Sequence, residues 1–280
     1  MELLRYAAFS ERGDGGNPAG VVLDADGISS EGMLEIAAEV GYSETAFVTE
    51  RTGRTLSVRY FSPKMEVPFC GHATIATAVA FADVHGPGDL LLSTQAGPIK
   101  VSTSVNPAGF TDATLVSVPP RVEAMDEVLL DELLAILGWS PTDLDPGLPP
   151  RVANAGASHP IIAAATRERL ADLVYDFPVL AELMARARWT TIDLVWRESA
   201  DVFHARNLFP PGGIVEDPAT GAAAAAFGGY LRALALIALP ATATVYQGHD
   251  MGRPSRITLS IPEDPASGIS VTGTALALSP

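Results

Sequence analysis

The 280-residue sequence predicts an α+β protein of two pseudo-symmetric lobes, each a β-barrel-like sheet wrapped around a central helix. Three observations support this fold class. Short β-rich runs dominate the chain. Two helical segments, 72–83 and 219–236, are apolar or small on nearly every side, so each must be enclosed rather than packed on a surface. The third observation is an internal repeat at the start of these two helices.

Hydrophobic periodicity assigns the remaining elements. Surface helices are expected over 30–40, 127–137, 167–174 and 178–188, and Gly41 and Gly138 can end the first two. Residues 140–150 are rich in Pro, Asp and Gly and predict a loop. Strands are expected over 2–9, 19–23, 45–49, 55–61, 89–94, 97–105, 111–118, 151–155, 160–164, 190–197, 201–208, 241–247, 256–262 and 269–278.

The repeat consists of EVPFCGHA at 66–73 and EDPATGAA at 216–223, which share the pattern E-x-P-x-x-G-x-A at an offset of 150 residues. An F-x-P precedes each copy, and a strand ending in Gln (Gln95, Gln247) follows each helix. The common order indicates an internal duplication. We expect an N-terminal lobe over 1–118, completed by the strand 269–280, and a C-terminal lobe over 119–268. A functional cleft between two such lobes is the default expectation.

The composition excludes several partners. A net charge of -15 argues against nucleic acid and anionic membranes, because phosphate binding needs a basic face. Cys70 is the single cysteine, which excludes an internal disulfide and a cysteine-built structural zinc site. Five histidines (72, 85, 159, 204, 249) show no metal-ligand spacing, so no metal is expected.

The distribution of apolar residues predicts a cytoplasmic protein. The chain starts with a strand-like stretch and has no signal-peptide pattern. Its most apolar segment, 219–245, is interrupted by two glycines, Arg232 and Pro240, and is better explained as a buried helix and a strand than as a membrane span.

The two repeated helix starts are candidate anion sites. Gly71 and Gly221 would let a ligand approach free backbone N–H groups, where the helix dipole favours a carboxylate. The simpler alternative is that each glycine only makes a tight connection into a buried helix. Their paired occurrence favours the binding role.

Acidic residues and one histidine supply candidate acid–base groups. Glu44 begins a predicted strand after a helix, and Glu66 and Glu216 compete with it as candidate bases. His72 lies in the first turn of its helix, although a lone histidine is more often a core residue. Asp217 suits an N-cap with Pro218 in the first helical position, which is compatible with ligand binding. The stretch Asn17 to Gly20 predicts a turn.

Several enzyme classes lack their sequence motifs. The chain has no P-loop, no dinucleotide-binding G-x-G-x-x-G, no G-x-S-x-G elbow and no H-E-x-x-H. Chemistry is therefore expected to rest on acid–base groups and positioned dipoles.

Four motifs, taken together, resemble the PhzF family, which is related to phenazine biosynthesis, and they cover nearly the whole chain in that family's order. The motifs are GNPAGVV at 16–22, SETAFV at 43–48, GHAT at 71–74 and EDPATG at 216–221. The resemblance implies the fold of diaminopimelate epimerase and cofactor-independent isomerisation of a small carboxylic acid. It also suggests a homodimer.

The same resemblance implies roles for individual residues. Glu44 matches the catalytic base, His72 and Asp217 match polar residues that bind substrate and help the proton move, and Gly71 and Gly221 match the helix starts that receive the substrate. Asn17 and Ala222 complete the expected substrate-binding set. The family's phenazine enzyme has a Ser where this chain has Ala222.

Two further functions compete with the isomerase. The Ala at 222 favours a binding protein that keeps the cleft without turnover, whereas the joint presence of Glu44, His72 and Asp217 favours catalysis. A structural subunit of the same fold would bind no small molecule. The related epimerases use two cysteines, but here Cys70 is matched by Thr220, which argues against a two-thiol reaction.

Overall fold

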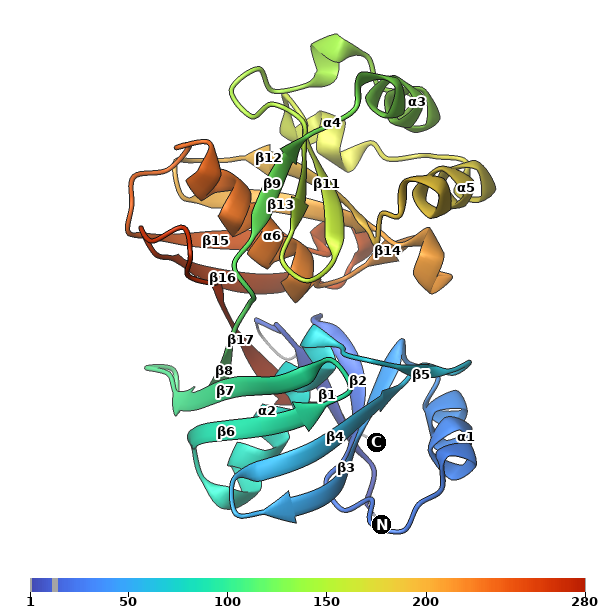
Figure 1. Cartoon of the computed structure of the whole chain (residues 1–280), viewed down its shortest axis with the longest axis vertical. Helices are drawn as coiled ribbons and strands as arrows, with labels where there is room; N and C mark the ends of the chain where they lie inside the picture. Colours follow the sequence, from blue (N-terminus) through green and yellow to red (C-terminus); the bar gives the residue numbers. More distant parts are fainter. Residues whose placement is uncertain (1, 12–14, 280) are drawn as a thin grey trace. The chain divides into compact units, whose positions relative to one another are not determined.

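The structure, a computed structural model, describes residues 2–11 and 15–279. Residues 1 and 280, the outer bounds of the predicted lobes, lie outside the described residues, as do 12–14. The chain divides into unit 1, Met1–Val116 with Thr272–Pro280, and unit 2, Ser117–Val271. Each unit combines one curved β-sheet with a central helix and smaller outer elements (Figure 1).

Unit 1 is a closed barrel of eight strands with one helix inside and one outside. It contains β1 (Leu4–Ala8), β2 (Asn17–Val22), α1 (Ser30–Val40), β3 (Glu44–Thr52), β4 (Thr55–Phe61), β5 (Glu66–Val67), α2 (Gly71–His85), β6 (Gly88–Thr94), β7 (Gly97–Val105), β8 (Thr111–Val116) and β17 (Ser270–Ala277).

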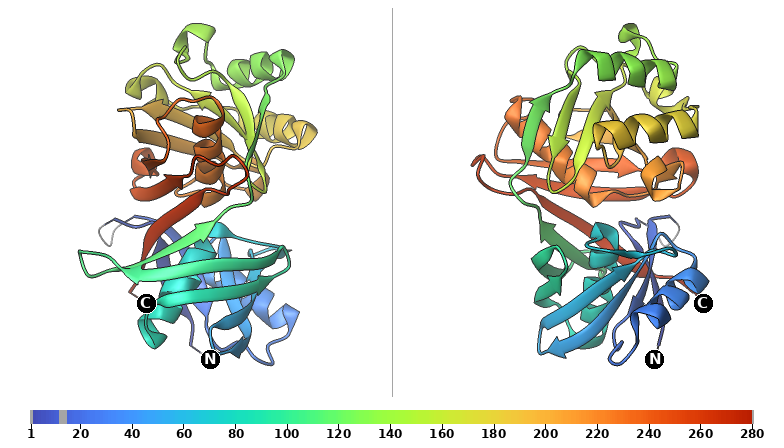
Figure 2. Two further views of the ribbon diagram at one scale, coloured as in Figure 1. Left: turned by 60° about the vertical axis from the view of Figure 1, so that its left-hand side comes forward. Right: turned by 45° about the vertical axis from the view of Figure 1, so that its right-hand side comes forward.

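The strand pairings close the barrel in the order β1, β2, β3, β4, β6, β7, β8, β17 and back to β1. The closing strand comes from the far end of the chain, with Tyr6 opposite Ala277 and Ala8 opposite Ala275. Figure 2 shows this dark red strand running beside the strands of unit 1. The N-terminal strands therefore depend on the C-terminal segment for their hydrogen bonds.

The two helices of unit 1 differ in composition because they occupy different environments. Residues His72 to Ala82 of α2 are all buried, since α2 packs against strands on several sides of the barrel. By contrast, α1 buries only Met33 and Ala37 and packs against β3 and β4. Ser29 caps its first turn and Gly41, in the left-handed region, ends it.

Unit 2 repeats this plan with additional helices. It contains β9 (Arg121–Ala124), α3 (Glu127–Leu137), η1 (Pro141–Asp143), β10 (Arg151–Asn154), β11 (Ser158–Ala163), α4 (Arg167–Ala171), α5 (Phe177–Ala187), β12 (Ile192–Arg197), β13 (Val202–Leu208), η2 (Pro210–Gly212), β14 (Glu216–Asp217), α6 (Gly221–Ala233), β15 (Ala241–Gln247), η3 (His249–Met251) and β16 (Ser255–Ile261).

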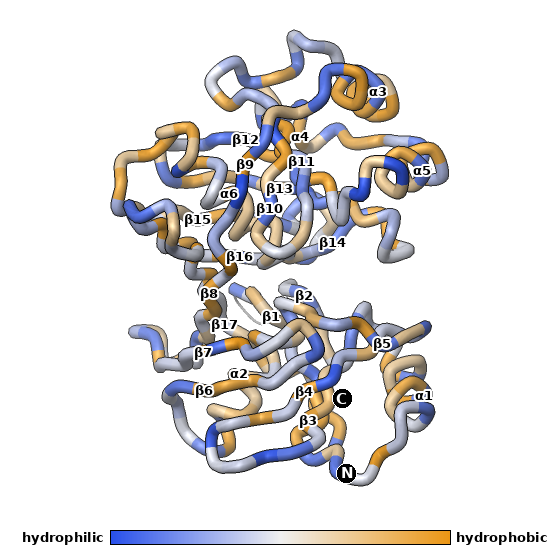
Figure 3. The backbone as a smooth tube through the Cα atoms, in the orientation of Figure 1, coloured by the Kyte–Doolittle hydropathy of each residue, from blue (hydrophilic) through white to orange (hydrophobic). Residues whose placement is uncertain are grey.

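In unit 2 the strands follow the order β9, β10, β11, β12, β13, β15, β16 around the buried helix α6. Two glycines in the middle of α6 allow close packing: a Cβ at Gly229 would lie 2.2 Å from a Pro120 side-chain atom, and one at Gly228 would lie 2.9 Å from Ile269. The amphipathic helices α3 and α5 cover a second core, and the tube of α3 alternates between hydrophobic and hydrophilic colours (Figure 3).

These features confirm the predicted α+β class, with a barrel-like sheet around a central helix in each unit. All six predicted helices are present, although α4 ends at Ala171 rather than at 174. None of the helices in the described ranges combines the length and apolarity that a membrane crossing requires.

Two local predictions are wrong. Residues 17–20 do not form a turn but begin strand β2, whose backbone pairs with β1. Asp217 is not the N-cap of α6: it lies in the short strand β14, and the helix, expected over 219–236, runs from Gly221 to Ala233 with Thr220 as its N-cap. Pro218 therefore lies before the helix instead of in its first turn.

Candidate active site

Glu44 is fixed at the first position of β3. Its register partner is Ala19 on the parallel strand β2, and Gly20 follows beside Thr45. A Cβ at Gly20 would lie 2.6 Å from Thr45 Oγ1, so only glycine lets the two strands approach this closely. The GNPAG stretch thus sets the position of the strand end that carries the carboxylate. Asn17 is buried on the same strand, two residues before Ala19.

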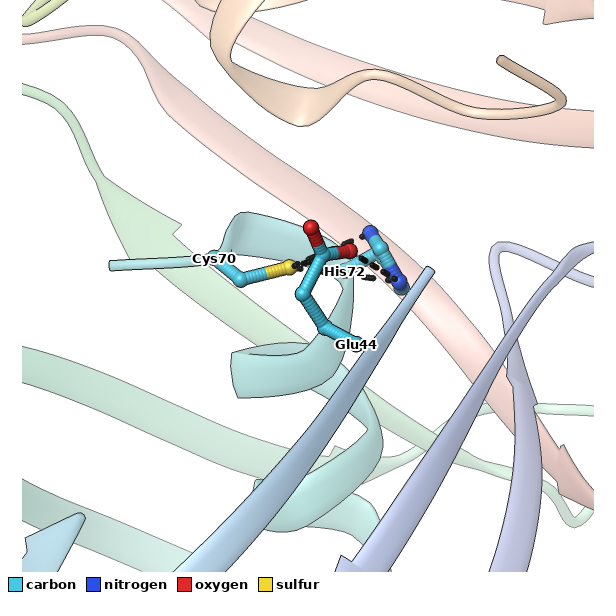
Figure 4. A group of neighbouring side chains, drawn as sticks. All are labelled: Glu44, Cys70 and His72. Carbon is cyan, nitrogen blue, oxygen red and sulfur yellow. Dashed lines mark hydrogen bonds and ion pairs between the residues drawn. The ribbon is translucent and has the colours of Figure 1, made fainter. Parts of the chain in front are cut away.

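The carboxylate of Glu44 meets two side chains from the start of α2. Glu44 Oε2 lies 3.5 Å from His72 Nε2 and accepts a hydrogen bond of 3.5 Å from the thiol of Cys70. Cys70 Sγ lies 3.3 Å from His72 Nδ1, and Ser43 Oγ lies 3.3 Å from His72 Nε2. Figure 4 shows the carboxylate between the thiol and the imidazole. Cys70 and His72 are buried, while Glu44 remains partly exposed.

The start of α2 is suited to an anion. Cys70 is the N-cap residue but makes no side-chain cap hydrogen bond to the first turn. A Cβ at Gly71 would meet no heavy atom within 4 Å among the described residues. A helix start with uncapped backbone N–H groups and open space can bind a carboxylate. The structure therefore brings Glu44, Gly71 and His72 together, as the sequence predicts, and adds Cys70 and Ser43.

The other predicted residues lie in unit 2, around the start of α6. Asp217 accepts a 2.5 Å hydrogen bond from the hydroxyl of Thr220, the N-cap residue. Gln247 ties this turn together: its Nε2 donates to the carbonyl of Asp217 at 2.7 Å, and its Oε1 accepts from the backbone N–H of Thr220 at 3.1 Å. Gly221 and Ala222 are the first two residues of the helix.

A second acidic residue lies two strands from Asp217. In the sheet register Asn207 is opposite Asp217 on one side and Asp193 on the other. Asn207 donates a 3.2 Å hydrogen bond to Asp193. Burial raises the pKa of Asp193 to about 7, although this hydrogen bond opposes the shift. Asp193 is therefore a carboxyl group that is readily protonated near neutral pH.

Glu66 and Glu216, the competing candidate bases, are both held in ion pairs. Arg59 donates two hydrogen bonds to Glu66, at 2.7 and 2.6 Å, and Arg206 donates two to Glu216, at 3.0 and 2.6 Å. The Arg59 guanidinium lowers the pKa of Glu66. A carboxylate bound at both oxygens is a poor base, so Glu44 is the better candidate of the three.

Sequence reasoning missed Cys70, Ser43, Thr220 and Gln247 as parts of the site. The repeat itself carried a signal for three of them: Cys70 and Thr220 hold equivalent places before the helices, and Gln247 ends the following strand. Ser43 lies next to Glu44 but belongs to no repeated pattern, so only the fold shows its contact with the imidazole.

The duplicated α+β architecture, with a curved sheet around an enclosed helix in each unit, is that of the diaminopimelate epimerase-like class of folds. A structure of a probable proline racemase from Agrobacterium radiobacter shares this fold with a TM-score of 0.67 at 14% identity, covering 99% of this chain and 91% of that chain.

More similar proteins specify the family. The family described as phenazine biosynthesis-like protein, PhzC-PhzF, matches residues 6–279. An uncharacterized isomerase from Deinococcus radiodurans is 34% identical, with 92% of this chain and 87% of the relative covered. The crystal structure of the Bacillus anthracis phenazine biosynthesis protein of the PhzF family aligns with a TM-score of 0.88 at 27% identity, covering 100% and 98% of the two chains. The chain belongs to the PhzC-PhzF family of phenazine biosynthesis-like proteins.

Proposed function

We propose that the protein isomerises a small carboxylic acid by moving a proton without a cofactor, with Glu44 as the general base. The isomerase class follows from the family, in which relatives such as the Deinococcus radiodurans protein are named isomerases. The observation that supports the residue assignment is the contact between the Glu44 carboxylate and the His72 imidazole beside the uncapped start of α2.

In the proposed reaction the substrate carboxylate binds the N–H groups at Gly71 and His72. Glu44 then removes a proton from a carbon atom of the substrate. The electron pair of the broken C–H bond shifts the neighbouring double bond, and the proton returns to a different carbon, so substrate and product are isomers. His72, 3.5 Å from Glu44, positions the carboxylate and can share its proton.

Asp217 is proposed to bind a polar group of a substrate. The support is its firm placement by Thr220 and Gln247 beside the second uncapped helix start. Ala222 offers no hydroxyl there, so we expect a substrate different from that of the family's phenazine enzyme. A site that lacks one hydrogen-bonding group discriminates strongly among substrates.

The decisive experiment compares the wild type with Glu44→Gln in D₂O. Both proteins are incubated with a panel of dihydroaromatic and unsaturated amino and hydroxy acids, and deuterium incorporation is followed by mass spectrometry. We expect incorporation in at least one compound by the wild type and a loss of on the order of 100-fold or more in the variant, which keeps the shape of the side chain but removes the base.

Glu50→Gln provides a matched control, because Glu50 lies on the same strand, is exposed, and its carboxylate accepts a weak hydrogen bond of 3.4 Å from the hydroxyl of Ser57. It should exchange as the wild type does. If the wild type and Glu44→Gln bind the same panel compound and neither incorporates deuterium, the proposal is wrong and the protein binds without turnover. Equal incorporation by both would show that Glu44 is not the base.

A further inference from the structure

We propose that Glu44, Cys70 and His72 form a binding site for Zn²⁺ and that zinc bound there inhibits the enzyme. The three residues offer a carboxylate, a thiol and an imidazole from two elements of unit 1, and their ligand atoms all lie within 4.8 Å of one another. Figure 4 shows the three side chains converging on one point. The residues are too scattered in sequence to give a metal-binding motif.

The distances match the requirements of zinc. With Zn–S near ~2.3 Å and Zn–N and Zn–O near ~2.1 Å, the ligand atoms of a tetrahedral site lie roughly 3.4–3.6 Å apart. Glu44 Oε2 is 3.5 Å from both His72 Nε2 and Cys70 Sγ. Cys70 Sγ is 3.9 Å from His72 Nε2, so this separation alone must shorten, by about 0.3 Å. Side-chain rotation is sufficient for such a change.

The ligand types select the metal. A thiolate with an imidazole favours Zn²⁺ over Mg²⁺ or Ca²⁺, which prefer oxygen ligands. Three protein ligands leave a fourth tetrahedral position for water, as in zinc sites that are open to small molecules. Glu44 is 15% exposed, so an ion can reach the group from solvent. Binding releases the thiol proton of Cys70 to water, and the thiolate, the carboxylate and an imidazole nitrogen then supply the three ligand atoms.

Only one of the two repeated units carries this set. By strand register and helix position, Thr191, Thr220 and Ala222 of unit 2 correspond to Glu44, Cys70 and His72. Neither a threonine hydroxyl nor a methyl group is a zinc ligand of comparable strength. The proposal therefore predicts one zinc ion per chain.

Inhibition rests on the proposed function, whereas binding does not. Zinc on Glu44 would occupy the oxygen that removes the substrate proton. The metal would then act as a reversible block, set by the concentration of free zinc, on an enzyme whose proposed reaction uses no metal.

Cobalt spectroscopy tests binding directly. Co²⁺ takes the place of Zn²⁺ in such sites, and a thiolate ligand gives it an intense charge-transfer absorption in the near ultraviolet. Because Cys70 is the single cysteine, any such band in the wild type must come from it. We expect the band at one equivalent of Co²⁺, its loss on addition of one equivalent of Zn²⁺, and its absence in Cys70→Ser. No thiolate band in the wild type would overturn the proposal, whatever the variants do.

Competition with a chromophoric chelator measures zinc affinity. Loss of one of three ligands should weaken it at least about tenfold in Cys70→Ser and in His72→Gln. His204→Gln is the matched control, because His204 belongs to unit 2, contacts Glu198 at 2.6 Å and could bind adventitious metal. Unchanged affinity in Cys70→Ser, or lost affinity in His204→Gln, would contradict the site.

The exchange assay separates the two proposals. Zinc should abolish deuterium incorporation by the wild type, and a chelator should restore it. A thiolate–cobalt band in a protein that exchanges no substrate proton would contradict the proposed function and leave the zinc site intact. Full exchange by the zinc-loaded protein would contradict inhibition.

Discussion

Glu66 and Glu216 occupy equivalent places in the two units, and each accepts two hydrogen bonds from an arginine on the neighbouring strand. The registers agree: Phe61 is opposite Glu66, and Leu208 is opposite Glu216. The pairs differ in exposure, because the side chain of Glu66 is 22% exposed and that of Glu216 is 4% exposed. Duplication has thus preserved one ion pair in two environments.

This difference predicts unequal effects of the same substitution. Glu216→Gln should lower the free energy of unfolding by about 3–5 kcal/mol, because it leaves the guanidinium of Arg206, whose side chain is 11% exposed, without its counter-charge. Glu66→Gln should cost about 1–2 kcal/mol, since water can partly solvate Arg59. Urea unfolding measures both. A larger loss in Glu66→Gln would contradict the assignment of the difference to burial.

The buried carboxyl group of Asp193 should make the stability of the fold depend on pH. Burial raises its pKa from 3.8 to about 7, so between about pH 4 and pH 7 the folded chain holds a proton that the unfolded chain has released. Raising the pH through this window therefore destabilises the fold. Asp193→Asn removes the titration, and its melting temperature relative to the wild type should rise as the pH increases from about 4 to about 7.

The buried imidazole of His159 should give a pH dependence of stability with the opposite sign, and it serves as the comparison for Asp193. Burial lowers its pKa to about 4, so its contribution to stability is lost as the pH falls below 6.5. The melting temperature of His159→Gln relative to the wild type should rise towards acid pH. Parallel pH profiles for wild type, Asp193→Asn and His159→Gln would show that neither group titrates as its burial implies.

At the scale of residues, part of the site could be predicted. Gly71 and His72 are adjacent in sequence and lie at a repeated helix start, so predicting the helix is enough to predict that they lie together. The contact of Glu44 with Cys70 joins residues on different elements, β3 and the turn before α2, and only the curvature of the barrel brings them together. No local pattern carries that information.

At the scale of elements, the approach of β2 to β3 positions the candidate base. Gly20→Ala would place a methyl group 2.6 Å from Thr45 Oγ1, beside Glu44. We expect a loss of about 1–3 kcal/mol in the free energy of unfolding, from overpacking between the strands. Deuterium exchange with substrate should also fall, because the start of β3 must move.

The double variant Gly20→Ala, Thr45→Ala tests this explanation. Thr45 Oγ1 is buried without a hydrogen-bond partner among the described residues, so its removal leaves no donor or acceptor behind. The second substitution removes the two closest atoms and should restore much of the stability and exchange. If the double variant is no better than Gly20→Ala alone, the clash with Thr45 is not the cause.

Long periodic elements were predictable, and short ones were not. The helices over 30–40 and 127–137 have the predicted bounds, because their apolar spacing and terminal glycines agree. Strands β5 and β14 have two residues each, which is too short for an alternating pattern of apolar and polar residues to be recognised. Pro18 and its neighbours favour a turn. In the structure Pro18 is the second residue of β2 and precedes the residues that pair with β3, and Pro is tolerated near the start of a strand.

At the scale of the whole molecule, β17 completes the barrel of unit 1. A chain that ends at Val271 should leave β1 and β8 without their shared partner. Amide hydrogen exchange in β1 and β8 should accelerate by on the order of 100-fold or more, while β12 and β13 of unit 2 keep their protection. A chain that lacks only residues 279–280 is the control. Retained protection in β1 after loss of β17 would contradict the closed barrel.

The late position of β17 also has a consequence for biosynthesis. The ribosome completes β8 roughly 150 residues before it reaches β17, which at ~5–20 residues per second takes about 8–30 seconds. During this interval the nascent N-terminal strands have two open edges, each able to pair with another chain. Unit 2, continuous in sequence, can fold as soon as it emerges. The N-terminal strands are therefore the first to be made and among the last to close, which makes them the segment for which a chaperone matters most.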